Sequence, residues 1–179
     1  MFNYVRVRVP YPARGGNIMN ILETDKSIWT VVVGSNPAIC VTTNGMTKKD
    51  GSAVMGRGIA RECAVMFPDI PVKLGERIIS SGSGVYNFGV HIKEFDGITH
   101  RFSILSFPTK TDWRYNSDKD LICRSCVRLV ELTDLYEFDR VFLPPPGCGN
   151  GGLNWERDVK DLISQYLDDR FAVVLRKAE

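Results

Sequence analysis

Short apolar and β-branched runs, separated by turn-forming residues, are the main pattern along this chain of 179 residues. Such runs are typical of strands with one or both faces buried in a sheet. Two of the runs are joined by Asp96-Gly97, which is the strongest short-range hairpin signal in the sequence. The segments that we expect to be strands are residues 5–9, 18–22, 28–33, 38–42, 85–95, 98–107, 141–143 and 171–175.

Apolar residues also repeat at helical spacing in three longer segments. These expected helices are residues 59–67, 118–138 and 155–167. Strands predominate in the first half of the chain, and strands and helices alternate in the second half. This order predicts one α/β domain in which helices cover both faces of a mixed sheet. Ligands bind such sheets at the carboxyl ends of the strands, so we expect the loops after Thr42, Phe107 and Leu143 to share one rim.

The composition narrows the class of protein only slightly. A net charge of +2, with 44% apolar and 25% charged residues, gives no broad electrostatic case for a nucleic-acid or membrane surface. No apolar run approaches the roughly 20 residues that span a bilayer, and the N-terminus lacks a signal-peptide core, so we expect a cytoplasmic protein. Five cysteines do not favour a disulfide framework. Cys123 and Cys126 form a CxxC inside a helical pattern, which favours two small helix residues over a zinc site.

The most unusual stretch of the chain precedes the last expected helix. Residues 144–152 contain three prolines and four glycines. Proline stops strand pairing, and clustered glycine lets backbone N–H groups approach a ligand without a Cβ in the way. A strand followed by a glycine-rich loop and a helix N-terminus favours an anion such as phosphate. A tight crossover loop without a ligand is an equally good interpretation of this stretch alone.

A second glycine-rich segment, residues 51–58, approximates the P-loop pattern G-x-x-x-x-G-K-[ST]. Arg57 replaces the lysine of that pattern and Gly58 replaces the hydroxyl residue that holds magnesium, so a nucleoside triphosphatase is disfavoured. Gly56 and Gly58 before a helix suit a diphosphate bound by main-chain N–H groups; the alternative is a flexible insert. Asn44, at the end of the preceding strand, could bind a sugar hydroxyl or cap its own loop, and the sequence leaves both open.

Lys110 comes just after an expected strand, where a lysine can lie over a pocket. Asp112, Trp113 and Arg114 add a carboxylate, a stacking surface and a second cation. A solvated surface charge is the plain alternative for Lys110. Both histidines fall in the expected hairpin, which argues against a Ser/His/Asp triad, and no carboxylates show the pairing of a glycosidase.

Taken together and in this order, four short motifs resemble those of the macrodomains, which bind ADP-ribose. They are TTNG (residues 42–45), VMGRGIA (54–60), SFPTK (106–110) and LPPPGCGNGGLNW (143–155). The resemblance covers residues 17–175 and implies a three-layer α/β/α macrodomain fold with a central mixed, mostly parallel sheet. It divides the chain into an N-terminal extension, residues 1–16, which we expect to add an edge strand, and a macrodomain, residues 17–179.

The same resemblance implies a binding mode for ADP-ribose. The diphosphate would lie between the two glycine-rich loops, Asp25 would read the adenine and Asn44 would face the distal ribose. Lys110 matches the lysine on which macrodomain hydrolases depend, so the expected catalytic residues are Lys110 and Asn44. The expected ligand-binding residues are Asp25, Gly45, Val54, Met55, Gly56, Gly58, Ile59, Pro146, Gly147, Cys148, Gly149, Asn150, Gly151 and Gly152. We expect neither a metal nor a cofactor.

Among macrodomains, the chain most resembles the antitoxins that remove ADP-ribose from thymine bases in DNA, and compact members of bacteria and phages. A eukaryotic relative that acts on acidic side chains pairs its lysine with an aspartate, where this chain has Gly151. The resemblance implies a glycohydrolase that acts on a modified DNA base or protein side chain. Nucleic acid would be a partner only as the modified substrate, and we expect no membrane partner. A monomer is the favoured oligomeric state. The alternatives are a non-catalytic reader of ADP-ribose or a related NAD-derived nucleotide, and a phosphatase acting on ADP-ribose 1″-phosphate.

Overall fold

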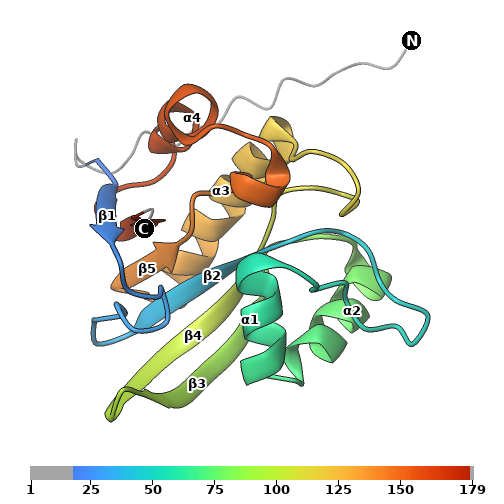
Figure 1. Ribbon diagram of the computed structural model, residues 1–179, viewed down its shortest axis with the longest axis horizontal. Helices are drawn as coiled ribbons and strands as arrows, with labels where there is room; N and C mark the ends of the chain where they lie inside the picture. The colour runs from blue at the N-terminus through green and yellow to red at the C-terminus, as the bar shows by residue number, and fades with distance from the viewer. Residues whose placement is uncertain (1–17, 178–179) are drawn as a thin grey trace.

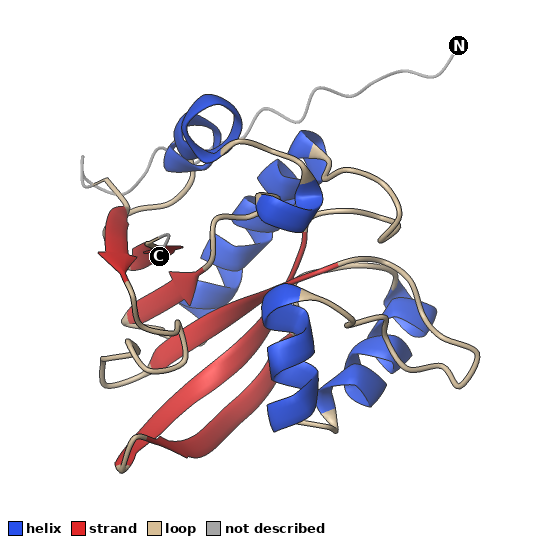
Figure 2. Ribbon diagram, in the orientation of Figure 1, coloured by secondary structure: helices blue, strands red, loops and turns tan. Residues whose placement is uncertain are grey.

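The computed structural model of the protein describes residues 18–177. Six strands form one continuous layer, which helices flank (Figures 1 and 2). In chain order, the elements are β1 (Asn20–Thr24), β2 (Pro37–Thr43), α1 (Gly58–Met66), α2 (Ile70–Ser81), β3 (Asn87–Phe95), β4 (Ile98–Pro108), α3 (Lys119–Leu135), β5 (Arg140–Leu143), α4 (Lys160–Ser164) and β6 (Phe171–Arg176). A 3₁₀ turn, Gly149–Gly151, and a π-helical turn, Trp155–Val159, lie between β5 and α4.

The sheet has the strand order β1-β6-β5-β2-β4-β3. All neighbours are parallel except β3 and β4, which form an antiparallel hairpin at one edge. The hairpin turns at Asp96 and Gly97, whose φ values of 51° and 77° fit the tight turn that an Asp-Gly pair favours. The mixed sheet expected from the residue pattern, and the mostly parallel arrangement that the resemblance implies, are therefore confirmed.

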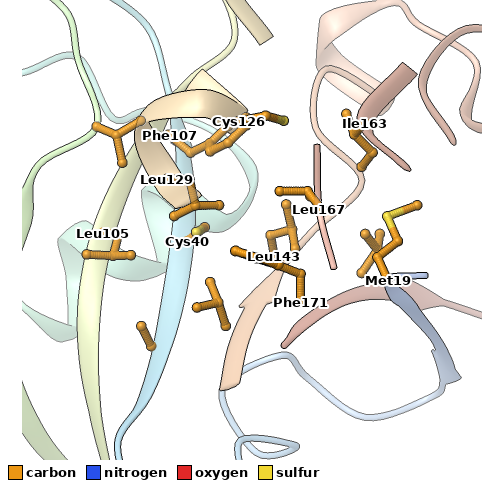
Figure 3. Close-up of a cluster of buried hydrophobic side chains, with 14 of the residues drawn as sticks. Met19, Cys40, Leu105, Phe107, Cys126, Leu129, Leu143, Ile163, Leu167 and Phe171 are labelled. Atoms are coloured by element: carbon orange, nitrogen blue, oxygen red, sulfur yellow. The ribbon is translucent and has the colours of Figure 1, made fainter. Parts of the chain in front are cut away.

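Alternate residues of the central strands feed two separate cores. In β2, Ala38 and Cys40 contribute to the core beneath α3 and α4, while Ile39 and Val41 contribute to the core beneath α1 and α2. Figure 3 shows the first of these clusters, in which Leu129 of α3 and Ile163 of α4 approach the sheet. Because both faces of the sheet are covered in this way, the molecule has the three-layer α/β/α arrangement.

The structure corrects one expected strand and adds one helix. Residues 28–33 are not a strand: Ser27 starts a turn, accepting hydrogen bonds from the N–H and the hydroxyl of Thr30. Trp29 and Val32 are buried in the second core, so tertiary packing decides this segment rather than β-propensity. The residue pattern predicted no helix at Ile70–Ser81, where the structure has α2.

The other elements expected within residues 18–177 are present, most with ends shifted by a few residues. The helix expected at 118–138 is α3, and Asp118 caps it by accepting hydrogen bonds from the N–H groups of Asp120 and Leu121. The helix expected at 155–167 begins with the π-helical turn and continues as α4. The strand expected at 5–9 and the extension at 1–16 lie outside the described residues. Within residues 18–177, no helix is long and apolar enough to cross a membrane.

Candidate functional site

The loops after β2, β4 and β5 meet at one rim of the sheet, as expected, and enclose a cleft of about 760 Å³. The central position of β2, between β4 and β5, brings these three loops together. The residues that line the cleft are Thr42, Thr43, Asn44, Val54, Gly56, Arg57, Gly58, Ile59, Ala60, Thr109, Lys110, Trp113, Arg114, Tyr115, Asn116, Ser117, Pro144, Pro145, Gly147, Cys148, Gly149, Asn150 and Gly151.

The N-terminus of α1 forms one wall of the cleft. Gly58 begins the helix with a φ of 54°, in the left-handed region that favours glycine. The N–H groups of Gly58, Ile59 and Ala60 donate no hydrogen bond to any residue between 18 and 177. First-turn N–H groups have no partner within their own helix, and the helix dipole adds a partial positive charge there. This wall is suited to an anionic ligand.

The glycine-rich loop after β5 forms the opposite wall. Gly147 and Gly149 have φ values of 78° and 64°, which a residue with a Cβ rarely adopts. The N–H groups of Gly149 and Asn150 also donate no hydrogen bond within the described part of the chain. A Cβ built on Gly58 would lie 3.9 Å from Asn150 Nδ2, so the two walls face each other across a short gap. Backbone N–H groups from both sides could therefore hold a diphosphate.

Lys110 ties two of the loops together. Its Nζ donates hydrogen bonds to the carbonyl oxygens of Tyr115, at 2.9 Å, and of Asn150, at 3.0 Å. The side chain is half-buried, and this desolvation lowers the pKa of the Lys110 ammonium below its usual value. Lys110 therefore lies in the cleft, as expected. Its two hydrogen bonds also join the loop after β4 to the loop after β5, and we call this connection the Lys110 latch.

Asn44 lines the cleft, but its amide is engaged within its own loop. Its Nδ2 donates to the Val54 carbonyl at 2.9 Å, and its Oδ1 accepts from the Met46 N–H at 2.9 Å. Of the two roles that the sequence leaves open, the structure shows the loop cap directly. One amide hydrogen and one acceptor lone pair remain for a ligand.

Gly151 lies where the loop leaves no room for a side chain. A Cβ on Gly151 would collide with Ser117 Oγ and lie 3.1 Å from Ser117 Cβ. A Cβ on Gly147 would be 2.9 Å from the same Ser117 Cβ. The Ser117 side chain therefore fills the space beneath both glycines, and its buried Oγ has no hydrogen-bond partner in the described residues.

The segment between Lys110 and Ser117 supplies cleft residues that were absent from the expected binding set. Asp112 is buried, and its carboxylate accepts hydrogen bonds from Nε and Nη2 of Arg114, the shortest at 2.6 Å. These bonds hold the pKa of Asp112 at about 2, well below its usual range. Trp113 and Tyr115 remain 54% and 67% exposed. A tryptophan three residues after an expected catalytic lysine was the signal available in the sequence.

Five expected ligand-binding residues do not line the cleft: Asp25, Gly45, Met55, Pro146 and Gly152. Asp25 is exposed at the end of β1. Gly45 serves the scaffold, since its N–H donates to the Thr111 carbonyl and a Cβ would lie 2.9 Å from that oxygen. Met55 and Pro146 are buried, and Gly152 has a left-handed φ of 75° that ends the 3₁₀ turn. The other expected residues all reach the cleft.

A second cavity of about 500 Å³ runs along α1 and shares Gly58 with the cleft. It lies between Arg61, Glu62 and Met66 of the helix and the turn around Trp29. Trp29 Nε1 donates to Glu62 Oε2 at 2.8 Å, which fixes one side of this cavity.

The CxxC cysteines lie away from the cleft, on α3. Cys126 is fully buried in the core, where desolvation raises its pKa well above the usual value. Residues 18–177 contain no group of three or more histidine, cysteine, aspartate or glutamate side chains that could hold a metal ion.

A three-layer α/β/α fold, with two facing glycine loops and a latched lysine at the carboxyl rim of the sheet, defines the class of protein: the chain is a macrodomain. Two curated proteins are similar to it over about two thirds of its length. It is 34% identical over 129 residues to the DNA ADP-ribosyl glycohydrolase of Mycobacterium tuberculosis (strain ATCC 25618 / H37Rv), a match that covers 68% of this chain and 34% of that protein. It is also 34% identical over 127 residues to the protein of the same name from Thermus aquaticus, covering 64% of this chain and 31% of that one.

Solved structures agree with this assignment. The macrodomain of Mycobacterium tuberculosis DarG has a TM-score of 0.65 and 24% identity, covering 90% of this chain and 99% of that chain. The macrodomain of Thermus aquaticus DarG has a TM-score of 0.60 and 26% identity, covering 88% and 98%. Thermosipho africanus DarTG in complex with ADP-ribose has a TM-score of 0.62 and 24% identity, covering 77% and 37%. No family model matches the chain. The chain spans about a third of the length of the curated relatives it matches.

Proposed function

We propose that the protein binds ADP-ribose in the cleft and hydrolyses the glycosidic bond that joins it to a DNA base. The observation that carries this proposal is the position of Lys110, whose Nζ lies beside the glycine loop at 3.0 Å from the Asn150 carbonyl. The similarity to DNA ADP-ribosyl glycohydrolases supports a modified DNA base as substrate. The N–H groups at the N-terminus of α1 and in the glycine loop would hold the diphosphate.

The bound nucleotide would lie across the cleft with its distal ribose between Asn44 and Lys110. Both residues line the cleft, and each retains free hydrogen-bonding capacity. Asn44 would contact a ribose hydroxyl through its remaining N–H or lone pair, while its bonds to Val54 and Met46 keep the amide fixed. This arrangement would place the anomeric carbon near the lysine.

The cleft favours chemistry that depends on Lys110 rather than on a carboxylate. None of the described residues lining it is an aspartate or a glutamate. Nearby Asp112 is bound to Arg114, and its pKa of about 2 makes it a weak base near neutral pH. In the net reaction, the bond between the anomeric carbon and the base breaks, water supplies the hydroxyl to that carbon, and the base departs with a proton.

Lys110 can assist this reaction in two protonation states. As an ammonium, it would donate two N–H groups to Tyr115 and Asn150 and direct the third towards the departing base. As an amine, it would keep the same two bonds and direct its lone pair towards the anomeric carbon. Desolvation lowers the pKa and so increases the amine fraction at a given pH. On the second route the base leaves as the lysine nitrogen bonds to the anomeric carbon, and water then hydrolyses the adduct to release ADP-ribose and regenerate the amine. Ring opening of the adduct gives a Schiff base, so borohydride trapping would identify this route.

The test is a single-turnover assay on purified substrates. They are DNA modified on thymine, DNA modified on guanine, and protein modified on glutamate or aspartate. Wild type should release ADP-ribose from modified DNA, and Lys110→Ala should reduce that rate by at least about 100-fold, the size typical of losing a group that stabilises a transition state. Lys73→Ala, which removes an exposed lysine on α2, is the matched control and should retain the wild-type rate. Unchanged turnover in Lys110→Ala would refute the proposal.

A second candidate is a reader that binds ADP-ribose without cleaving it. The absence of a carboxylate from the described lining of the cleft favours this alternative. A reader would bind ADP-ribose in calorimetry and leave all three substrates intact. Lys110→Ala should keep most of the affinity for free ADP-ribose under either function, because the diphosphate would be held by backbone N–H groups.

A further inference from the structure

We infer that the loop at residues 111–116 is a stacking subsite for the nucleobase that carries ADP-ribose, with Trp113 as its platform. The inference rests on the proposed function, because it concerns the group on the far side of the bond that would be broken. The inference assigns residues to the part of the cleft that would hold the leaving group. The contacts proposed for the diphosphate and the ribose do not assign any.

The exposure of the loop's aromatic residues is the first observation. Trp113 and Tyr115 are 54% and 67% exposed, and both line the cleft. No other cleft-lining residue belongs to the large apolar side chains that are strongly exposed within residues 18–177. Apolar rings at the mouth of a cleft gain free energy when a flat partner covers them.

The second observation is that hydrogen bonds fix the loop at both ends and in the middle. At its start, the Thr111 carbonyl accepts from the Gly45 N–H at 3.0 Å. At its end, the Ser117 N–H donates to the Gly151 carbonyl at 2.8 Å. In the middle, Asp112 accepts the N–H of Arg114 at 2.9 Å as well as its guanidinium. The rings are therefore presented on a supported backbone, which reduces the entropy lost when a ligand binds.

The third observation is the distance to the expected chemistry. Lys110 Nζ donates to the Tyr115 carbonyl at 2.9 Å, so the loop is in direct contact with the lysine. A base attached to the anomeric carbon would enter the part of the cleft that Trp113 and Tyr115 line. Arg114 also lines the cleft, and the Asp112 carboxylate holds its guanidinium at 2.6 Å. A planar cation of this kind stacks on bases as aromatic rings do.

These features favour a nucleobase over a protein side chain as the occupant. A base has two apolar faces that cover an indole ring, whereas a modified glutamate or aspartate presents only a short flexible stem at the same position. A paired and stacked base in duplex DNA has both faces covered already. The subsite is therefore suited to an unpaired base in a single strand.

Trp113→Ala tests the inference, with Trp113→Phe as the conservative variant and Tyr136→Ala as the matched control. Tyr136 is an exposed aromatic residue outside the cleft. Each variant, and the parent protein with Trp113 unchanged, also carries Lys110→Ala so that the substrate is not cleaved during the titration. All are titrated with free ADP-ribose by calorimetry, and with a single-stranded oligonucleotide and a glutamate peptide that both carry ADP-ribose. The parent, which is wild type at Trp113, reports binding of the oligonucleotide through tryptophan fluorescence, since Trp113 is more exposed than Trp29 and Trp155.

Trp113→Ala should weaken binding of the modified oligonucleotide by about 5- to 100-fold, the range measured for loss of one base–aromatic stack. Its affinities for free ADP-ribose and for the modified peptide should stay within about twofold of the parent's, and Trp113→Phe should recover most of the loss. An unchanged oligonucleotide affinity, or an equal loss for free ADP-ribose, overturns the inference. Failure of the proposed function is a separate result. It would appear in the turnover assay, where wild type would release no ADP-ribose, and the binding affinities could still be compared.

Discussion

Gly75 lies in the middle of α2 and packs against residues 51–53, which lead to the rim of the cleft. A single methyl group added at Gly75 should therefore disturb this rim. A Cβ at this position would collide with the Gly51 carbonyl oxygen and lie 2.9 Å from both the Ala53 nitrogen and the Ser52 Cα. All three atoms belong to backbone, so no side chain can rotate away. The segment is also fixed to the helix, because the Ala53 N–H donates to the Pro71 carbonyl at 2.8 Å.

Two effects of opposite sign act on Gly75→Ala. Alanine has a higher helix propensity than glycine and should stabilise α2 by about 1 kcal/mol. Overpacking against rigid backbone costs about 3 kcal/mol, at the upper end of the usual range. The net loss of about 2 kcal/mol should lower Tm by about 4–8 °C in a domain of this size. Thermal unfolding followed by circular dichroism measures this shift.

The same substitution should also reach the cleft. Residues 51–53 lead directly to Val54, whose carbonyl accepts a hydrogen bond from Asn44. Displacing them should therefore loosen the Asn44 cap and weaken ADP-ribose binding. Gly56→Ala is the control for stability, since no heavy atom lies within 4 Å of the Cβ position, and its Tm should stay the same or rise slightly. A Gly75→Ala protein as stable as wild type would refute the packing argument.

Two further predictions concern the other side of the cleft. Gly151→Ala should destabilise the protein by about 1–3 kcal/mol, because the added Cβ would collide with Ser117. Adding Ser117→Gly should restore most of this free energy of unfolding, as measured by denaturant unfolding. If the losses of the two substitutions simply add, the contact is not the cause. Arg114 depresses the folded-state pKa of Asp112 to about 2, so the stabilising contribution of this carboxylate should be present above pH ~4 and disappear as the pH falls towards 2. The stability difference between wild type and Asp112→Asn should shrink over that interval, and a difference independent of pH would contradict the assignment.

The sequence predicted most of the sheet because its strands carry the information locally. In β2 every residue from 37 to 41 is buried, and such a run of apolar and β-branched residues is typical of a parallel strand covered on both faces. The Asp96-Gly97 pair likewise specified its hairpin without help from the rest of the fold. The facing glycine loops could also be predicted, because few other structures require so many glycines between a strand and a helix.

The misses have a common cause in contacts between distant segments. Residues 28–33 have strand propensity, but Trp29 is anchored by Glu62 of α1 and becomes part of the core instead. Helix α2 escaped notice because Pro71 and Gly75 interrupt its pattern, although proline is tolerated in a first helical turn and Gly75 is required by the loop it touches. The pattern of residues within one segment does not show which distant residues will pack against it.

At the site, the sequence located residues but not their hydrogen bonds. It placed Lys110 and Asn44 at strand ends, where both indeed line the cleft. The latch formed by Lys110 and the cap formed by Asn44 depend on carbonyl oxygens of other loops, which have no side-chain signature. The packing of Ser117 beneath Gly147 and Gly151 is equally invisible before the loops are folded.

The strand order has a consequence for how the chain assembles. The first strand, β1, pairs only with β6 in the sheet of residues 18–177, and Asn20 stands opposite Ala172. Within this sheet, β1 therefore has no neighbour until β6 has also been synthesised. Pairing of such distant segments slows folding and leaves strand edges open to other chains in the meantime. The nascent chain should thus be most vulnerable to aggregation in the interval between synthesis of β1 and synthesis of β6.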